Sequence, residues 1–211
     1  MKFYLPGIHV LHRKNTLKSP VVRMNAPSTV TIPMLMHIGK PAVPAVSVGD
    51  AVKVDTLIGA ADGYISSNIY SSVSGKVIKL EQQLLYNGAY GTSVVIQSDG
   101  MMTADKHLSV PSVNNRQQLV DALKNSGIVG LGGAGFPTHV KFNVDPARVE
   151  TLVINGAECE PYITSDSYTM IERTDDMEYA IRVLQQYFPL KRVIIGIESN
   201  KKTAISRRLY Y

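Results

Sequence analysis

The hydrophobic pattern of this chain changes once, near residues 100–115, and that change constrains the fold more than any other feature. Before it, from Val30 to about Asp99, short apolar runs alternate with turn residues, which is typical of a small β-sandwich or barrel. After it, helical spacing alternates with short apolar runs, which favours an α/β arrangement. The sequence therefore predicts a two-domain α+β chain, with residues 1–104 forming an N-terminal arm and an all-β domain and residues 112–211 forming a truncated α/β domain.

The strands expected in the first part are short apolar runs bounded by Gly, Pro, Asn or Asp. They are Thr29–Pro33, Ala45–Val48, Leu57–Gly59, Tyr64–Ile65, Lys76–Leu80 and Ser93–Gln97. A Gly-Asp turn at Gly49 and a Ser-Gly turn at Gly75 resemble those of biotinyl/lipoyl-type barrel-sandwich domains. Such carriers attach their cofactor to a lysine between these turns, but no lysine occurs from Val54 through Gly75. We therefore expect a structural or docking role for this domain.

The second part alternates helical and strand patterns. Its expected helices are Arg116–Ser126, which Gly127 ends, Met170–Tyr187, which ends before Pro189, and a last one within residues 200–209. Its expected buried strands are Thr151–Asn155 and Arg192–Ile197. A strand, a helix and a strand in that order predict a right-handed parallel crossover. Two strands make a small sheet, so we expect an α/β fold cut short.

The segment 130–141 holds four glycines between positions 130 and 135, and Lys141 closes it. Backbone without side chains can approach a ligand closely and point several N–H groups at one anion. The glycines match G-x-G-x-x-G, but a helix is expected to end at Gly127 and Pro137 follows two residues after Gly135. That context differs from a Rossmann turn, so a Gly-rich turn for close packing stays an alternative. With the second unusual segment, residues 153–166, it suggests a pocket for a phosphorylated, ring-bearing cofactor.

Composition excludes several other classes. The net charge of +5 comes from scattered basic residues with no clustered stripe, so we expect no nucleic-acid partner. The short basic clusters Arg13-Lys14, Lys201-Lys202 and Arg207-Arg208 lie far apart in the sequence. The one cysteine, Cys159, excludes a disulfide framework and a multi-cysteine cluster within the chain, and the five histidines show no metal-ligand spacing with carboxylates. No apolar run approaches the ~20 residues of a membrane helix.

The two segments resemble those of the flavin-binding subunit of respiratory complex I, and most closely those of the RnfC family of the Rnf electron transport complex. The likeness is carried by Phe136–Thr138, Lys141 and residues 153–166. It extends to Gly7–His9 and to Ile32–Ala42, which read Gly-Ile-His and Ile-Pro-x-x-x-His-Ile-Gly-x-Pro-Ala. The resemblance implies a barrel-sandwich hybrid domain followed by a partial, Rossmann-like α/β domain of the complex I flavin-subunit type.

The resemblance further implies FMN and NADH as cofactors. It assigns cofactor contacts to Gly130, Gly132, Gly133, Phe136, Lys141, Asn155, Glu158 and Cys159. In this assignment the glycines line the flavin, Lys141 contacts its polar side and Phe136 faces the nicotinamide. Leu131 and Ala157 stand where complex I has Arg and Asp, so those two contacts are absent. No catalytic acid or base is expected, because hydride transfer to a flavin needs none.

Some of these residues also have simpler interpretations. Phe136 is equally suited to a core position. Glu158 and Glu160 suit helix capping or a solvated surface, and Asp166 is expected to cap the helix that follows it. Cys159 is expected to be a small polar neighbour of the flavin rather than a nucleophile, because no adjacent histidine supports thiolate chemistry.

The resemblance implies a subunit that oxidises NADH through FMN and passes electrons to 4Fe-4S iron–sulfur clusters in an ion-translocating NADH:ferredoxin oxidoreductase. The clusters are expected only in a missing C-terminal part, so the chain alone is expected to be incomplete as an enzyme. The expected partners are NADH and other Rnf subunits, which would hold it on the cytoplasmic face of the cell membrane. Two alternatives stay open: a soluble RnfC-like flavoprotein such as a cobalamin reductase, and a non-catalytic docking module that has lost its cofactor.

Overall fold

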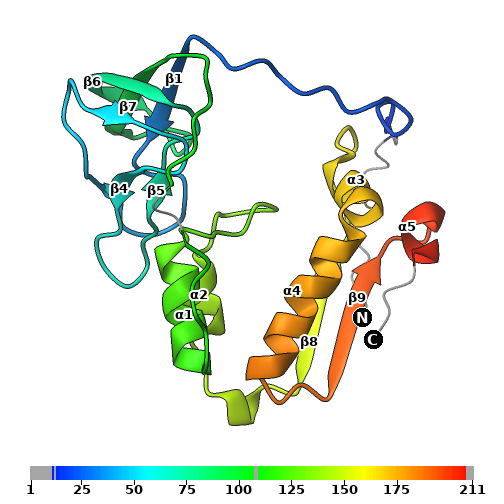
Figure 1. The fold of residues 1–211 in the computed structure, drawn as a ribbon. Coiled ribbons are helices and arrows are strands. Elements are labelled where there is room, and N and C mark those ends of the chain that lie inside the picture. Colours follow the sequence, from blue (N-terminus) through cyan, green and yellow to red (C-terminus); the bar gives the residue numbers. More distant parts are fainter. Residues whose placement is uncertain (1–10, 12, 107–108, 208–211) are drawn as a thin grey trace, which may run out of the picture. The chain divides into compact units, whose positions relative to one another are not determined.

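The computed structural model describes residue 11, residues 13–106 and residues 109–207. The chain forms two compact units, drawn in Figure 1. The sandwich unit comprises Met24–Val144. The α/β unit comprises Asp145–Tyr211 together with the N-terminal segment that ends at Arg23.

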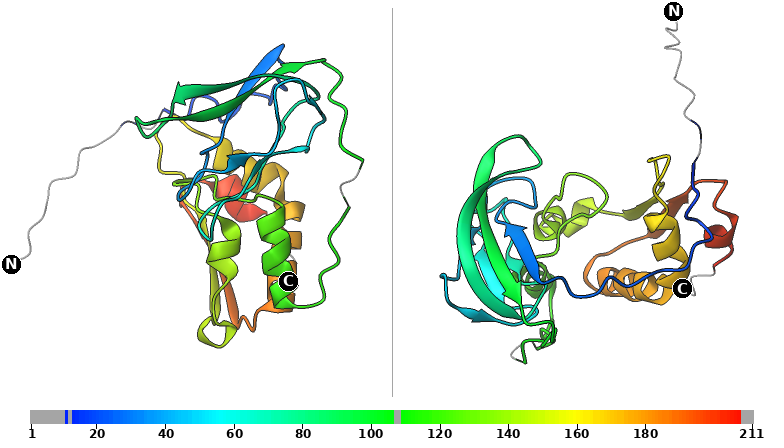
Figure 2. Two further views of the ribbon diagram at one scale, coloured as in Figure 1. Left: turned by 90° about the vertical axis from the view of Figure 1, so that its left-hand side faces the viewer. Right: turned by 90° about the horizontal axis from the view of Figure 1, so that it is seen from above.

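Two antiparallel sheets enclose the core of the sandwich unit. One sheet has the order β1-β7-β6-β3, from Thr29–Pro33, Tyr90–Ser98, Gly75–Leu84 and Ala51–Val52. The other has the order β2-β4-β5, from Val43–Pro44, Leu57–Ala60 and Ile69–Tyr70. The hairpin of β6 and β7 is strongly curved (Figure 2), and a register shift lies between Val77 and Lys79. The buried core includes Met34, Ile58, Val77 and Ile96.

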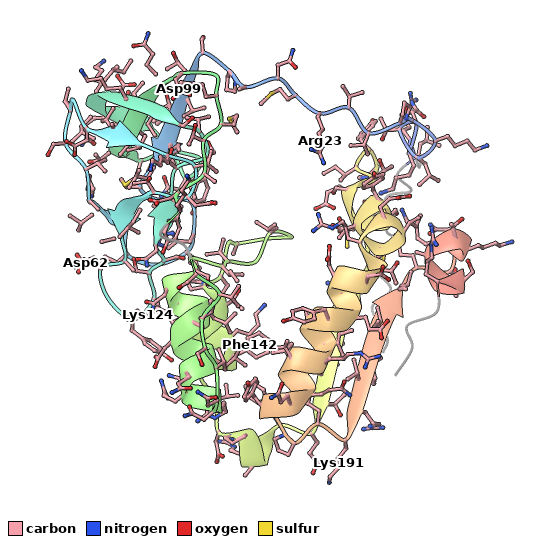
Figure 3. All side chains as sticks on the ribbon, in the orientation of Figure 1. Arg23, Asp62, Asp99, Lys124, Phe142 and Lys191 are labelled. Carbon is pink, nitrogen blue, oxygen red and sulfur yellow. The ribbon has the colours of Figure 1, made fainter. Side chains whose placement is uncertain are left out.

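The Ser-Gly turn before β6 needs glycine for two reasons. Gly75 has φ +155°, and a Cβ there would lie 2.0 Å from the carbonyl oxygen of Gln97. The Ser74 hydroxyl donates to Asp99 Oδ1 (2.7 Å), and Asp99 directly follows β7 (Figure 3). The turn is therefore fixed against the end of the neighbouring strand, and it redirects the chain as the sequence predicted.

Two predicted strands are wrong. Residues Ala45–Val48 do not form a strand, because Ser47 N–H donates to Asp50 Oδ2 (2.8 Å) and closes a turn there. Tyr64–Ile65 lies in a loop whose backbone is bound by nearby side chains. Asn68 Oδ1 accepts from Ala61 N–H (2.9 Å), and Ser66 Oγ accepts from Asp62 N–H (3.1 Å). The strands β2, β3 and β5 were not predicted.

Helix α1 (Arg116–Asn125) begins and ends as its sequence suggests. The side chain of Asn115 accepts from Gln118 N–H (2.9 Å) at its start. After its last turn Gly127 has φ +67°, so the predicted stop at this glycine is confirmed. Helix α2 (Thr138–Phe142) packs beside α1, and Figure 3 marks Lys124 on α1 and Phe142 on α2.

The α/β unit contains two parallel strands, β8 (Thr151–Gly156) and β9 (Arg192–Ile197), paired in register from Thr151 with Arg192. Between them lie α3 (Ser165–Glu172) and α4 (Thr174–Tyr187), and a short 3-10 turn (Pro146–Arg148) precedes β8. The parallel crossover is confirmed, while its handedness stays a prediction. The predicted helix Met170–Tyr187 is two helices, because Arg173 departs from helical geometry at φ −117°, ψ 29°. Helix α5 (Lys202–Ser206) lies within the range expected for the last helix.

The contact units divide the chain differently from the domains predicted at 1–104 and 112–211. Residues 112–144, which hold α1, the glycine-rich segment and α2, contact the sandwich rather than the two-stranded sheet. The predicted domain boundaries stay a prediction. Across the described ranges, no helix combines the length and apolar character that crossing a bilayer requires.

Candidate functional site

The glycine-rich loop (residues 129–137) is a narrow hairpin in the sandwich unit. Val129 and Pro137 form an antiparallel bridge at its base. Gly130 N–H donates to the Phe136 carbonyl (3.0 Å), and Thr138 N–H donates to the Ile128 carbonyl (3.0 Å). These bonds hold the two arms together, so the remaining glycines lie at the tip.

The main chain at that tip is open. A Cβ at Gly132 or Gly133 would meet no atom within 4 Å, and the Leu131 side chain between Gly130 and Gly132 is 95 % exposed. Gly135 differs, because it has φ +64° and a Cβ would lie 2.9 Å from the Met36 carbonyl oxygen. Close packing therefore explains Gly135, whereas Gly132 and Gly133 leave the backbone accessible to a ligand.

The two side chains predicted beside this loop are accessible to different degrees. Phe136 is half-buried, and Lys141 on α2 is exposed. Buried His139 anchors that helix, since its Nε2 lies 3.0 Å from the Tyr64 carbonyl oxygen and its ring meets the Tyr64 ring edge-on. Asn143 Nδ2 donates to the Tyr64 hydroxyl (3.1 Å). The Lys141 ammonium is thus carried by a fixed helix.

A hollow of about 430 Å³ lies beside the glycine-rich loop within the same unit. Its walls come from β1 and the residues after it, from the tip of the β6–β7 hairpin and from the loop. The lining residues are Pro33, Leu35, Met36, Leu84, Leu85, Tyr86, Val129, Gly130, Leu131, Gly133, Ala134 and Gly135. Most of its walls are apolar, which suits the face of a ring better than a phosphate.

The Glu158 loop (residues 157–164) follows β8 in the α/β unit. Asn155 is exposed, and its Oδ1 accepts from Ala157 N–H (3.1 Å). Cys159 is an exposed free thiol, and Glu160 is exposed as well. Glu158 is the exception, because its side chain is fully buried.

The Glu158 carboxylate is the centre of a buried ion cluster. Its Oε2 accepts from Lys201 Nζ (2.5 Å), Lys14 Nζ (3.2 Å) and Ser167 Oγ (2.9 Å). Its Oε1 accepts from the main-chain N–H groups of Asp166 (2.9 Å) and Ser167 (3.4 Å). Both oxygens are therefore fully engaged by groups of the same unit.

These partners determine the charge of Glu158. Burial by itself raises the pKa of the carboxyl group, but the hydrogen bonds from Lys201, Ser167, Lys14 and Asp166 outweigh it and lower the pKa to about 2. The group is thus an anion throughout the ordinary pH range.

Glu158 also caps helix α3. Thr164 occupies the N-cap without a side-chain bond, and the first N–H groups of the helix donate to Glu158 instead. The capping interpretation of Glu158 is therefore confirmed. The expectation that Asp166 caps this helix is wrong, because Asp166 lies inside the first turn and its own N–H is one of those bound.

Sequence reasoning missed Lys14 and Lys201. Both belong to basic clusters that lie far apart in the sequence, yet they meet at one carboxylate although 144 and 43 residues separate them from Glu158. No local spacing carries such a signal, because the sequence alone does not reveal which segments lie together in the fold.

The two loops belong to different compact units, so the prediction that they line one pocket stays a prediction. The Gly7–His9 motif lies outside the described residues. In the part of the chain that the structure describes, no three His, Cys, Asp or Glu side chains gather where a metal ion could bind.

Comparison with known families gives two matches. Residues 3–101 match the RnfC barrel sandwich hybrid domain, and residues 123–208 match the Nuo51 FMN-binding domain. The second match includes both the glycine-rich loop and the Glu158 loop. The predicted barrel-sandwich hybrid and flavin-subunit type are confirmed by these matches, whereas a Rossmann-like course stays a prediction.

Curated relatives match nearly the whole chain. The RnfC-type subunit of the sodium-translocating ferredoxin:NAD⁺ oxidoreductase complex of Acetobacterium woodii is 40 % identical over 94 % of this chain and 46 % of its own length. The proton-translocating counterpart of Clostridium ljungdahlii is 35 % identical over 97 % of this chain and 46 % of its own. The corresponding subunit of the ion-translocating oxidoreductase complex of Rhodobacter capsulatus is 35 % identical over 97 % and 41 %.

The chain spans less than half the length of these curated relatives. Within that span the order of the two matched domains and the level of identity agree with one another. The chain therefore belongs to the RnfC family, whose members include subunits of ion-translocating ferredoxin:NAD⁺ oxidoreductase complexes.

Proposed function

We propose that this chain contributes the FMN site of an RnfC-type subunit that oxidises NADH in an ion-translocating electron-transport complex. The observation that carries the proposal is the match of residues 123–208 to an FMN-binding domain, combined with the open main chain at Gly132 and Gly133 inside that range. Transfer of electrons to iron–sulfur clusters, and attachment to the membrane through other subunits, belong to the same proposal.

The residues of the glycine-rich loop fit an anionic, ring-bearing cofactor. Gly130, Gly132 and Gly133 present main-chain N–H groups without side chains in front of them. The exposed Lys141 ammonium supplies a positive charge nearby in the sequence. When bound, FMN would supply the acceptor for the hydride of NADH, and half-buried Phe136 would offer an aromatic surface to the nicotinamide.

The residues of the Glu158 loop take less direct parts in this proposal. Asn155 and Cys159 are exposed and able to touch the flavin. Both oxygens of Glu158 already accept hydrogen bonds from protein groups, so this residue contributes by fixing the loop rather than by donating or accepting at the cofactor.

Titration of the purified protein with FMN, followed by quenching of flavin fluorescence, tests the proposal. We expect saturable binding that Lys141→Met weakens by at least about tenfold, the effect of losing a charged hydrogen bond. Lys124→Met is the matched control, because Lys124 is also exposed near the end of a helix of the sandwich unit. Absence of saturable binding by the unmodified protein would reject the FMN site and favour the docking module.

A further inference from the structure

The ammonium group of Lys14 lies in a cage of four oxygen atoms. Its Nζ is 2.6 Å from the carbonyl oxygens of both Glu160 and Ile163. It is also 3.2 Å from Glu158 Oε2 and 3.3 Å from the Glu158 carbonyl oxygen. An ammonium has three N–H donors, so at least one of them is shared between two acceptors.

The residues next to Lys14 are bound to the same loop. Arg13 N–H donates to the Pro161 carbonyl (3.1 Å), and the Thr16 and Thr164 hydroxyls lie 2.7 Å apart. The N-terminal segment thus follows the Glu158 loop from Glu158 to Thr164. This attachment joins parts of the chain that lie more than 140 residues apart in sequence.

Lys14 and Lys201 have separable tasks. Lys201 pairs with the Glu158 carboxylate at 2.5 Å, so the buried anion keeps a cationic partner when Lys14 is removed. Within the described part of the chain, Lys14 is the cation that contacts the carbonyl oxygens of Glu160 and Ile163, whose converging dipoles repel each other without a positive charge between them. Loss of Lys14 is therefore expected to loosen the loop before it unfolds the unit.

We propose that Lys14 is a positioning residue whose ammonium fills a monovalent-cation site and sets the shape of residues 158–163. That shape fixes the main chain around the exposed Cys159, one of the proposed flavin neighbours. The link to flavin rests on the proposed function, whereas the ordering of the loop does not.

Amide hydrogen exchange of the protein without FMN tests the ordering. We expect Lys14→Ala to speed exchange at residues 158–167 by at least about tenfold, because charged hydrogen bonds are lost, while α4 and β9 keep their rates. Lys18→Ala is the matched control, since Lys18 is an exposed lysine of the same segment. Equal rates in the two variants, or a loss that spreads over the whole unit, would overturn the proposal.

Chemical rescue distinguishes a cation site from general stabilisation. Ammonium chloride reproduces the missing group, so we expect it to restore slow exchange in Lys14→Ala, while choline chloride at the same ionic strength does not. No difference between the two salts would overturn the cation site. FMN titration of the same variants is read separately: if the unmodified protein binds no FMN, the proposed function fails while the exchange result still decides the role of Lys14.

Discussion

The glycine-rich loop and the Glu158 loop are held by different means. The first closes through main-chain hydrogen bonds between residues close in sequence, from Gly130 to Phe136 and around the Val129–Pro137 bridge. The second depends on ionised side chains from distant segments, Lys14 and Lys201, which converge on Glu158. The comparison separates a loop whose shape is local from one whose shape requires a charge to stay in place.

The largest expected effect is therefore the loss of the charge. Glu158→Ala leaves Lys14 and Lys201 without their shared anion and removes the cap of α3, so we expect a loss of about 3–5 kcal/mol in the free energy of unfolding of the α/β unit. Urea denaturation followed by tyrosine fluorescence measures it, and hydrogen exchange assigns it to the unit. Glu160→Ala, at an exposed neighbour, is expected to change stability by less than about 0.5 kcal/mol. Similar effects of the two substitutions would contradict the central place of Glu158.

In the glycine-rich loop the corresponding change concerns the backbone. Gly135→Ala puts a Cβ on a residue at φ +64° and within 2.9 Å of the Met36 carbonyl oxygen. We expect a loss of about 1–3 kcal/mol in the stability of the sandwich unit, from left-handed strain and the close contact. Thermal unfolding compared with that of Ala134→Gly, a change at the preceding residue, measures it. An unchanged melting temperature for Gly135→Ala would show that the loop accommodates the side chain.

The same distinction explains what sequence reasoning could reach. The end of α1 at Gly127 and the parallel pairing of β8 with β9 follow from local patterns, and both are found. The strand predicted at Ala45–Val48 failed because the Asp50 side chain binds the Ser47 backbone, a competition that periodicity does not reveal. The ion cluster was out of reach because its members are distant in sequence, although Glu158 itself was singled out.

Acid is expected to affect the two units in different pH ranges. In the sandwich unit, burial lowers the pKa of His37, and its contact with the Lys40 carbonyl raises it again in part. Because the folded pKa lies below the ordinary 6.5, stability is full above pH 6.5 and declines as the pH falls below it. In the α/β unit the lowered pKa of Glu158 gives stability that is full above about pH 4.5 and is lost as the pH falls toward 2.

Hydrogen exchange between pH 7.5 and pH 5, corrected for the intrinsic rates, checks this order. The sandwich unit is expected to weaken first, and His37→Gln is expected to flatten its pH dependence, because the Ser67 N–H that donates to Nε2 (3.1 Å) keeps an acceptor. Weakening of the α/β unit before the sandwich unit would contradict the assignment of these two groups.

The smallest effect on stability is expected where the proposed effect on function is largest. Gly132→Ala adds a Cβ with no atom within 4 Å, so we expect the free energy of unfolding to change by no more than the ~0.5 kcal/mol typical of surface substitutions. The same methyl group would stand between the main chain and a closely bound flavin, so FMN affinity is expected to fall while thermal unfolding stays unchanged. An affinity equal to that of the unmodified protein would remove Gly132 from the cofactor site, and a drop in both quantities would show that this glycine, like Gly135, serves the packing of the loop.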